Sequence, residues 1–322
     1  MIWLKFLISA AIIVWAGIRL TYYVDQLSDR LQLGKVWLGV VLLGFITSLP
    51  EVISSLSAVI FLNADDLALG NLLGSNNFNP MLLVVMDVVY RKGSITNAIV
   101  PHRSYRAAAG FAVVLTVIVM AGLWLPLGRI SSFIIAGVYF CGMRYLACLE
   151  KEPSTETKKD ESVIQRSLSG IVGNIVFSSI LVIGAAIWLA GLADNLAAQT
   201  GLGRTFFGSI FLALVTSLPE MVVSLSALKL GAFDLAVGNI FGSNMTNIFI
   251  VSLCEVFHKG GAFLSGVSQT HILTATLSIV LTCVAVAGIE LKNKKSFLGV
   301  GLDSFIMILL FLIGTQILYQ LR

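Results

Sequence analysis

The second half of this chain repeats the first half at a nearly constant offset. Thr47-Ser48-Leu49-Pro50-Glu51 returns as Thr216-Ser217-Leu218-Pro219-Glu220, and Ser55-Leu56-Ser57-Ala58 returns as Ser224-Leu225-Ser226-Ala227. After the loss of one residue, Gly70-Asn71, Gly74-Ser75-Asn76 and Asn79 return as Gly238-Asn239, Gly242-Ser243-Asn244 and Asn247. Such a repeat predicts a fold built from two copies of one unit.

Each copy is dominated by apolar stretches long enough to cross a bilayer, which takes about 20 residues per helix. Hydrophobic residues make up 57% of the chain and charged residues only 12%, so a soluble protein of this composition could not cover its surface with charge. The sequence therefore predicts an all-α membrane protein with ten transmembrane helices. They run approximately over residues 2–24, 36–62, 66–90, 105–125, 130–149, 168–193, 204–230, 232–256, 269–289 and 297–320.

A polar segment separates the two copies. We predict a first five-helix repeat over 1–149, a cytoplasmic linker over 150–166 and a second five-helix repeat over 167–322. Because five is odd, the second copy must enter the membrane from the opposite side. Two inverted repeats with polar, proline-interrupted helices at matching positions are typical of secondary transporters.

The basic residues favour one orientation. With the N-terminus outside, 16 of the 21 Lys and Arg residues fall on the inner side, as the positive-inside rule requires. The net charge of +4 therefore indicates topology and not a nucleic-acid partner. We predict a multi-pass protein of the cytoplasmic (inner) membrane with both termini outside. The five basic residues left outside are Lys5, Arg129, Arg204, Lys259 and Arg322.

Two carboxylates, Glu51 and Glu220, lie inside apolar helices, where a charge is costly and is normally kept for a functional partner. Thr47 and Ser48 precede Glu51 by one helical turn and share its face, as Thr216 and Ser217 do for Glu220. Proline before each glutamate removes a backbone donor and frees a carbonyl. The carboxylates, hydroxyls and freed carbonyls of the two motifs are hard oxygen ligands suited to sodium and calcium. The alternatives to a role as ion ligands are a structural role for the glutamates and, for the hydroxyls, hydrogen bonds within their own helix.

The second motif adds neutral oxygens. Ser75 and Asn79 lie one turn apart on one helical face, and so do Ser243 and Asn247. If these faces meet the glutamate helices, two repeats can supply the six to eight oxygens that calcium prefers. The paired glycines predict close helix packing. The remaining asparagines are expected to cap or brace the backbone: Asn71, Asn76, Asn239 and Asn244.

Other polar residues are assigned structural roles. Asp87 and Glu255 are expected to be solvated or ion-paired at helix ends, and Asp66 and Asp234 fit the pattern of helix N-caps. The four cysteines have no metal-ligand spacing and are expected to be small buried apolar residues. The three histidines are scattered and suggest no chemistry.

At these motifs the chain resembles the cation/calcium exchanger superfamily, nearest to the prokaryotic sodium/calcium exchangers. The family's Thr-Ser-x-Pro-Glu and Gly-Asn-x-x-Gly-Ser signatures each occur twice. The resemblance implies that Glu51 and Glu220 are the central ligands and that the first and sixth helices slide against the rest. It also implies ion-site roles for Thr47, Ser48, Ser75, Asn79, Thr216, Ser217, Ser243 and Asn247.

The chain departs from this family in two ways. Ile46 and Val215 stand where the family usually has glycine before the Thr-Ser pair, and β-branched residues restrict the backbone there. Asn247 stands where some prokaryotic relatives place an acid, so both Asn79 and Asn247 are amides.

The function predicted from these observations is antiport of calcium against sodium by alternating access. Calcium/proton antiport, potassium-dependent sodium/calcium antiport and a passive cation channel remain as alternatives. An intramembrane enzyme would need a nucleophile with a base or a histidine-containing metal motif, and no such set occurs, so no enzymatic activity is expected. The expected partners are calcium and sodium ions and the lipid bilayer, with no cofactor and no obligatory protein partner.

Overall fold

The computed structural model describes residues 2–31, 33–90, 94–125, 127–149, 167–197, 210, 212–292, 296–297 and 300–321. It is helical apart from one short antiparallel pair, β1 with β2, in which Ser296 faces Gly301. In chain order the elements are α1 (Ile2–Leu31), α2 (Lys35–Leu38), the π-helix η1 (Gly39–Leu43), α3 (Gly44–Thr47), α4 (Leu49–Leu62), α5 (Asp65–Tyr90), α6 (Ile95–Ala98), α7 (Arg103–Trp124), α8 (Ile130–Leu149), α9 (Leu168–Ala197), α11 (Ala213–Thr216), α12 (Leu218–Leu230), α13 (Phe233–Phe257), the 3₁₀ helix η4 (Phe263–Ser265), α14 (His271–Leu291), β1 (Ser296–Phe297), β2 (Val300–Gly301) and α15 (Leu302–Gln320).

Within the described residues, eight helices are long and apolar enough to cross a membrane. A ninth span forms if Lys35–Thr47 and Leu49–Leu62, bent by 41° at the break between them, count as one. The tenth expected span, over 204–230, begins outside the described residues, so the count of ten stays a prediction. The division into repeats and a linker also stays a prediction, because residues 150–166 lie outside the described part.

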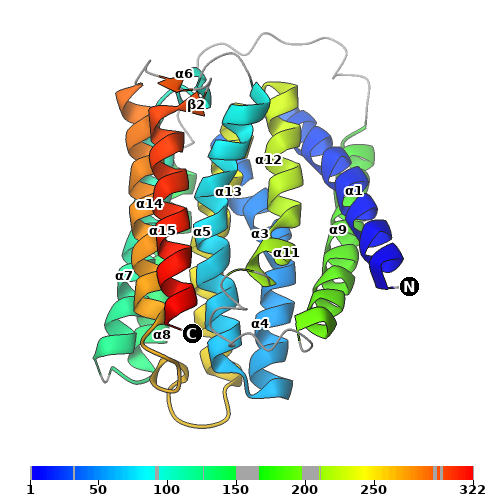
Figure 1. Cartoon of the computed structure of the whole chain (residues 1–322). Helices are drawn as coiled ribbons and strands as arrows, with labels where there is room; N and C mark the ends of the chain where they lie inside the picture. The colour runs from blue at the N-terminus through cyan, green and yellow to red at the C-terminus, as the bar shows by residue number, and fades with distance from the viewer. Residues whose placement is uncertain are drawn as a thin grey trace.

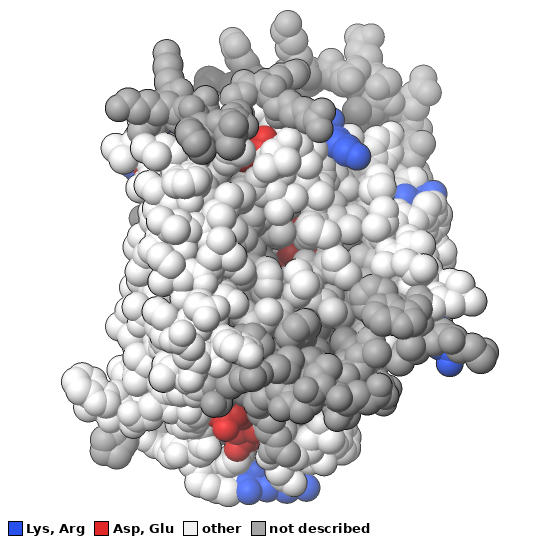
Figure 2. All heavy atoms as spheres, viewed as in Figure 1, with Lys and Arg blue, Asp and Glu red and all other residues white. Residues whose placement is uncertain are grey.

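Large apolar side chains face outward along these helices. Phe61, Trp124 and Leu291 are each more than three-quarters exposed. On the face shown in Figure 2, Lys and Arg gather towards the two ends of the molecule, and uncharged residues cover most of the area between them. An apolar belt of this extent would be a liability in water and is what a lipid-facing surface requires.

The two helices that carry the glycine motifs form the centre of the molecule. In the most apolar window of α5, 72% of the residues are buried, and in that of α13 the share is 78%, against 28% for both α8 and α15. In Figure 1, α1 and α9 pack side by side at one edge, while α7, α8, α14 and α15 cover the opposite side. The polar residues of α5 and α13 are therefore shielded from lipid by the other helices.

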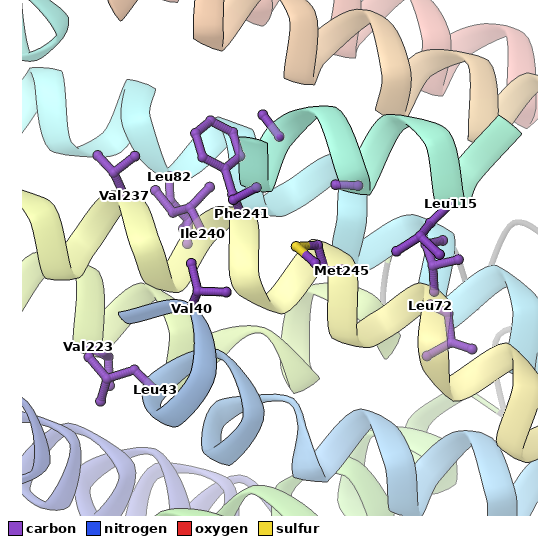
Figure 3. Packing of buried hydrophobic residues seen from close by; sticks show 14 of the residues in the cluster. Val40, Leu43, Leu72, Leu82, Leu115, Val223, Val237, Ile240, Phe241 and Met245 are labelled. Atoms are coloured by element: carbon purple, nitrogen blue, oxygen red, sulfur yellow. The ribbon is translucent and has the colours of Figure 1, made fainter. Parts of the chain in front are cut away.

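Glycines bring the broken helix of the first repeat against α13. A Cβ on Gly238 would lie 2.6 Å from the carbonyl oxygen of Val36 and 3.0 Å from Cα of Gly39. A Cβ on Gly242 would lie 2.5 Å from Cα of Val40. Figure 3 shows Val40 beside Ile240 and Phe241 of α13, in the cluster of buried apolar residues that surrounds this contact. The predicted close packing at the second-repeat glycines is confirmed.

Matching elements of the two repeats run in opposite directions. In Figure 1, α4 leads down to the lower end of the molecule before α5 begins, whereas α12 leads up to the upper end before α13 begins. The markers for the N- and C-termini both lie in the lower half of that view. These directions are those that an inverted repeat needs.

Polar residues at the ends of the central helices anchor neighbouring loops. Asp87 is buried and accepts backbone N–H groups from Ile95 and Gly301, each at 2.6 Å. Glu255 is nearly buried and accepts the N–H of Phe263 at 2.8 Å, with Arg129 3.2 Å from its other oxygen. A solvated role for this pair was wrong, because the following loop folds back over each carboxylate, although the ion pair at Glu255 was correct.

Two other expectations are also corrected. Asp66 lies within α5 and accepts the N–H of Ser268 at 2.7 Å. Asp234 lies in the first turn of α13, whose N-cap residue is Ala232, and accepts a hydrogen bond from the hydroxyl of Tyr105. Each aspartate therefore ties its helix to the other repeat and does not cap it. Among the cysteines only Cys254 is buried, while three are exposed on the apolar surface, where a thiol meets lipid: Cys141, Cys148 and Cys283.

Candidate functional site

The Thr-Ser-x-Pro-Glu motif breaks its helix at the same place in each repeat. Ser48 has φ −82° and ψ 0°, and Ser217 has φ −83° and ψ 6°, so both leave the helical region for a single residue. A new helix then starts with proline in its first turn, where the missing N–H costs nothing. The β-branched residues at 46 and 215 therefore do not prevent the break.

The break places each carboxylate in the interior. Glu51 and Glu220 are completely buried in the first turns of α4 and α12. The Oγ atoms of Ser75 and Ser217 lie 3.3 Å and 3.4 Å from Oε1 of Glu51 and donate to it. Ser48 donates to Oε1 of Glu220 at 3.4 Å. Each carboxylate is thus held by a serine from the opposite repeat.

The threonines of the two motifs make a matching crosswise contact. Thr47 Oγ1 lies 3.2 Å from Oδ1 of Asn239, and Thr216 Oγ1 lies 3.1 Å from Oδ1 of Asn71. Each hydroxyl is also within reach of a carbonyl one turn back, at Leu43 or Leu212. Ser243 differs from its mate Ser75, because its Oγ lies 3.3 Å from Thr47 Oγ1 and 3.4 Å from the carbonyl of Gly44.

A second polar group lies one turn further along α5 and α13. Asn79 Nδ2 donates to Oδ1 of Asn244 at 2.9 Å, and Asn247 Nδ2 donates to Oδ1 of Asn76 at 3.0 Å. Asn76 and Asn244 also donate to each other's backbone carbonyl, at 3.2 Å and 3.4 Å. These four asparagine contacts form two pairs related by exchange of the repeats, which is the pattern of a twofold axis.

Four buried oxygens near this axis accept no hydrogen bond from any described residue. They are Oε2 of Glu51, Oε2 of Glu220, Oδ1 of Asn79 and Oδ1 of Asn247, two symmetry-related pairs. Leaving a buried carboxylate or amide oxygen unpartnered is costly. A hard cation would satisfy oxygens of this kind without needing a donor hydrogen.

All ten residues expected from the sequence are buried and form hydrogen bonds in these two groups. The structure brings the threonines, serines and glutamates together, whereas Asn79 and Asn247 bond to asparagines and not to the carboxylates. Four asparagines that were expected to cap or brace the backbone take part in the hydrogen bonds between the two repeats: Asn71, Asn76, Asn239 and Asn244. Asn76 and Asn244 do bond backbone carbonyls, but Asn71 and Asn239 bond side chains of both repeats. Their exact recurrence in both copies is the signal that could have identified them.

Known proteins resemble this chain in sequence and in fold. The family described as sodium/calcium exchanger protein matches residues 1–147 and 170–320. The chain belongs to this family. It is therefore an integral multi-pass membrane protein from a family of transporters and not of enzymes. Both stretches of the match include one copy of each motif.

Two of the similar curated proteins match most of the chain, and a third matches a shorter stretch. Inner membrane protein YrbG of Escherichia coli is 26% identical over 76% of this chain and 76% of its own length. Putative antiporter CaxA of Alkalimonas amylolytica is 24% identical over 89% of this chain and 91% of its own length. Sodium/calcium exchanger MaX1 of Methanosarcina acetivorans is 34% identical, but over only 29% of this chain and 27% of its own.

The fold also matches that of a solved protein. A structure of the sodium-calcium exchanger NCX_Mj, soaked with sodium and without calcium, superposes with a TM-score of 0.73 at 18% identity. The match covers 98% of this chain and 99% of that one. At 18% identity the likeness establishes the fold alone. The description of the individual site residues rests on the geometry of the present chain.

Proposed function

We propose that this chain exchanges calcium for sodium across the membrane by alternating access. The observation that carries the proposal is the pair of buried carboxylates, each with one oxygen held by serine and the other without a hydrogen-bond partner among the described residues. Two such charges inside an apolar bundle call for a positive counterpart. A divalent cation between them neutralises both.

The surrounding oxygens favour calcium as that cation. The hydroxyls of Thr47, Ser48, Thr216 and Ser217 are buried in the group that contains the carboxylates, and the amide oxygens of Asn79 and Asn247 are buried one turn further along α5 and α13. Calcium takes six to eight oxygens in a flexible shell. A shell built from several helices can change its size when the helices shift.

Sodium as the coupling ion follows from the excess of neutral oxygens. A proton antiporter needs little beyond carboxylates that titrate, whereas several sodium ions each need an oxygen shell. Sites that share Glu51 and Glu220 with calcium would make occupancy exclusive, and exclusive occupancy couples the two fluxes. The names of MaX1 and NCX_Mj, both described as sodium/calcium exchangers, support the same pair of ions for this chain.

The remaining parts of the proposal concern movement and topology. The first and sixth predicted helices, α1 and α9, pack against each other along one edge of the bundle and are proposed to slide as a unit. The proposed location is the cytoplasmic (inner) membrane, for which the name of YrbG gives support, with both termini outside. The proposed repeats span 1–149 and 167–322, joined by a cytoplasmic linker.

The decisive test is uptake of radiolabelled calcium into proteoliposomes that contain the purified chain. An outward sodium gradient, with pH clamped equal on both sides by an ionophore, should drive calcium uptake against its own gradient. Absence of uptake there, together with robust uptake under a proton gradient in sodium-free buffer, would assign the chain to calcium/proton antiport. A requirement for potassium would indicate the potassium-dependent alternative, and flux that only follows the calcium gradient would indicate a channel.

A further inference from the structure

A groove opens between α1 and α12 on the outside of the bundle. Its volume is about 520 Å³, within the range of roughly 300–1,000 Å³ typical of small-molecule sites. The two helices are in close contact at Gly17, where a Cβ would lie 2.7 Å from Val222. The lining is mostly apolar and includes Val14, Ile18 and Leu225.

One wall of the groove carries a cation inside an apolar span. Among the described residues the partners of Arg19 are neutral: its Nη2 lies 2.8 Å from Oδ1 of Asn174, and its guanidinium lies over the rings of Trp15 and Tyr23. Its Nε is buried and has no hydrogen-bond partner among the described residues. An arginine in such a segment is normally paired with a negative group.

A second cation lies at the end of the same groove. Lys229 is in the last turn of α12, about 13 Å along the helix axis beyond Glu220 at a rise of about 1.5 Å per residue. This distance brings it near the edge of the hydrocarbon layer, whose half-thickness is about 15 Å. Among the described residues that line the groove there is no Asp or Glu, so neither cation has a negative partner in this lining.

We propose that this groove binds an anionic phospholipid, with an acyl chain along its apolar walls and the phosphate region between Lys229 and Arg19. The charge pattern favours an anionic over a zwitterionic headgroup, because an amine would find no acid among the lining residues. Basic pockets between helices on the cytoplasmic side are suited to anionic headgroups, and the predicted topology puts Lys229 on that side. Met221, which lines the groove, directly follows Glu220 in α12.

A second basic groove provides a matched control. It lies between α7 and α8 and is lined by Arg103, Arg106 and Phe111, with a volume of about 590 Å³. Arg106 already has a carboxylate 3.5 Å away on Glu290. Removal of this paired cation should therefore leave binding in the α1–α12 groove unchanged.

The test is a titration of the purified full-length chain in detergent with phosphatidylglycerol or phosphatidylcholine, followed by thermal melting. Phosphatidylglycerol should raise the melting temperature of the parent, and phosphatidylcholine should raise it much less. Lys229→Gln should require about tenfold more phosphatidylglycerol for the same rise, corresponding to about 1.4 kcal/mol. Because Lys229 is exposed and has no hydrogen-bond or ion-pair partner among the described residues, its lipid-free melting should match the parent.

Two further variants separate the groove from general surface charge. Val14→Trp keeps both cations but fills the groove, so it should weaken the phosphatidylglycerol effect as well, whereas Lys229→Arg should preserve it. Arg106→Gln should behave like the parent. Equal effects of the two lipids, an unchanged response in Val14→Trp, or a loss in Arg106→Gln as large as in Lys229→Gln would each overturn the proposal. Binding is the readout, so the result does not depend on which ions are transported.

Discussion

Ser217 donates a hydrogen bond from its Oγ to Oε1 of Glu51, 3.4 Å away in the other repeat. The reciprocal bond runs from Ser48 to Glu220 at the same distance. Neither repeat therefore contains a complete carboxylate environment by itself. Any shift of one repeat against the other must change the surroundings of both glutamates together.

Replacement of either carboxylate by its amide should nearly abolish calcium transport. Glu51→Gln and Glu220→Gln each keep an acceptor oxygen for the neighbouring serine but remove a charge from the proposed ligand shell. Loss of one partner of a buried charge pair costs about 3 kcal/mol or more, or about 100-fold in calcium affinity. Calcium uptake by proteoliposomes is the measurement.

Glu290→Gln is the control for this pair, because Glu290 lies 3.5 Å from Arg106 away from the site and is partly exposed. It should transport calcium like the parent. Normal calcium flux in either site variant would remove that glutamate from the ligand set.

Asn76→Ala should destabilise the chain. Asn76 donates to the carbonyl of Asn244 and accepts from Asn247. Alanine therefore leaves the buried amide of Asn247 without this partner, and it removes the side-chain bond to a carbonyl that keeps its helical bond within α13. At about 1–3 kcal/mol for the unpaired amide and about 1 kcal/mol for the lost hydrogen bond to the carbonyl, the total loss should be about 2–4 kcal/mol, seen as a lower melting temperature in detergent. Asn77→Ala is the matched control on the same helix, because Asn77 is also buried but its Oδ1 has no partner among the described residues. Equal melting of the two variants would contradict this account.

Gly238→Ala should be more damaging than a glycine substitution elsewhere. Its Cβ would lie 2.6 Å from the carbonyl oxygen of Val36, and backbone cannot yield as a flexible side chain can. Overpacking of this kind costs about 1–3 kcal/mol and should also separate the helices that form the site. Gly137→Ala has no atom within 4 Å of its new Cβ and should raise helix stability by up to about 1 kcal/mol. Melting temperature and yield of folded protein compare the two, and similar losses would argue against the close contact.

Single cysteines should report opposite sides of the membrane. Arg103 at the start of α7 and Lys259 beyond the end of α13 are both exposed, and the basic-residue bias puts the first inside and the second outside. In a background without the four native cysteines, Arg103→Cys and Lys259→Cys should react with an impermeant maleimide from opposite sides of a vesicle. Reaction of both from one side would refute the inverted arrangement.

Magnesium should compete only weakly for calcium transport. It holds its water tightly and requires a small octahedral site, whereas the proposed shell is assembled from side chains on several helices. Inhibition of calcium uptake by magnesium at concentrations similar to those of unlabelled calcium would contradict this shell. Strontium, a larger divalent cation of similar chemistry, provides the positive control.

The sequence predicted most of the helical spans, and the two repeats marked twice the polar residues that the structure buries together. The proline in each Thr-Ser-x-Pro-Glu motif was sufficient to locate the helix break, even with isoleucine or valine two residues before Ser48 and Ser217. The pairing across the axis could not be predicted, since an alignment of repeats shows equivalence but not contact. Thus a bond from Thr47 to Leu43 within its own helix could be expected from the sequence, but only the structure also places Thr47 against Asn239.

The ends of the central helices were predicted less well for a physical reason. Asp87 looks solvated because polar residues follow it, but the chain returns over it and supplies two backbone donors. Local sequence carries no sign of such a return. Asp66 was likewise misassigned, since its main contact, Ser268, lies in the other repeat.

The reciprocal asparagine contacts limit how the two halves of the gene can diverge. Asn76 meets Asn244 and Asn247, and Asn244 in turn meets Asn76 and Asn79, so each half forms the immediate environment of the other. A substitution in one half changes its contacts with side chains encoded in the other half, so a compensating change must arise in that other half. Lipid-facing positions have no such counterpart and can drift independently. The duplicated halves therefore remain alike at the axis while their outer surfaces lose resemblance.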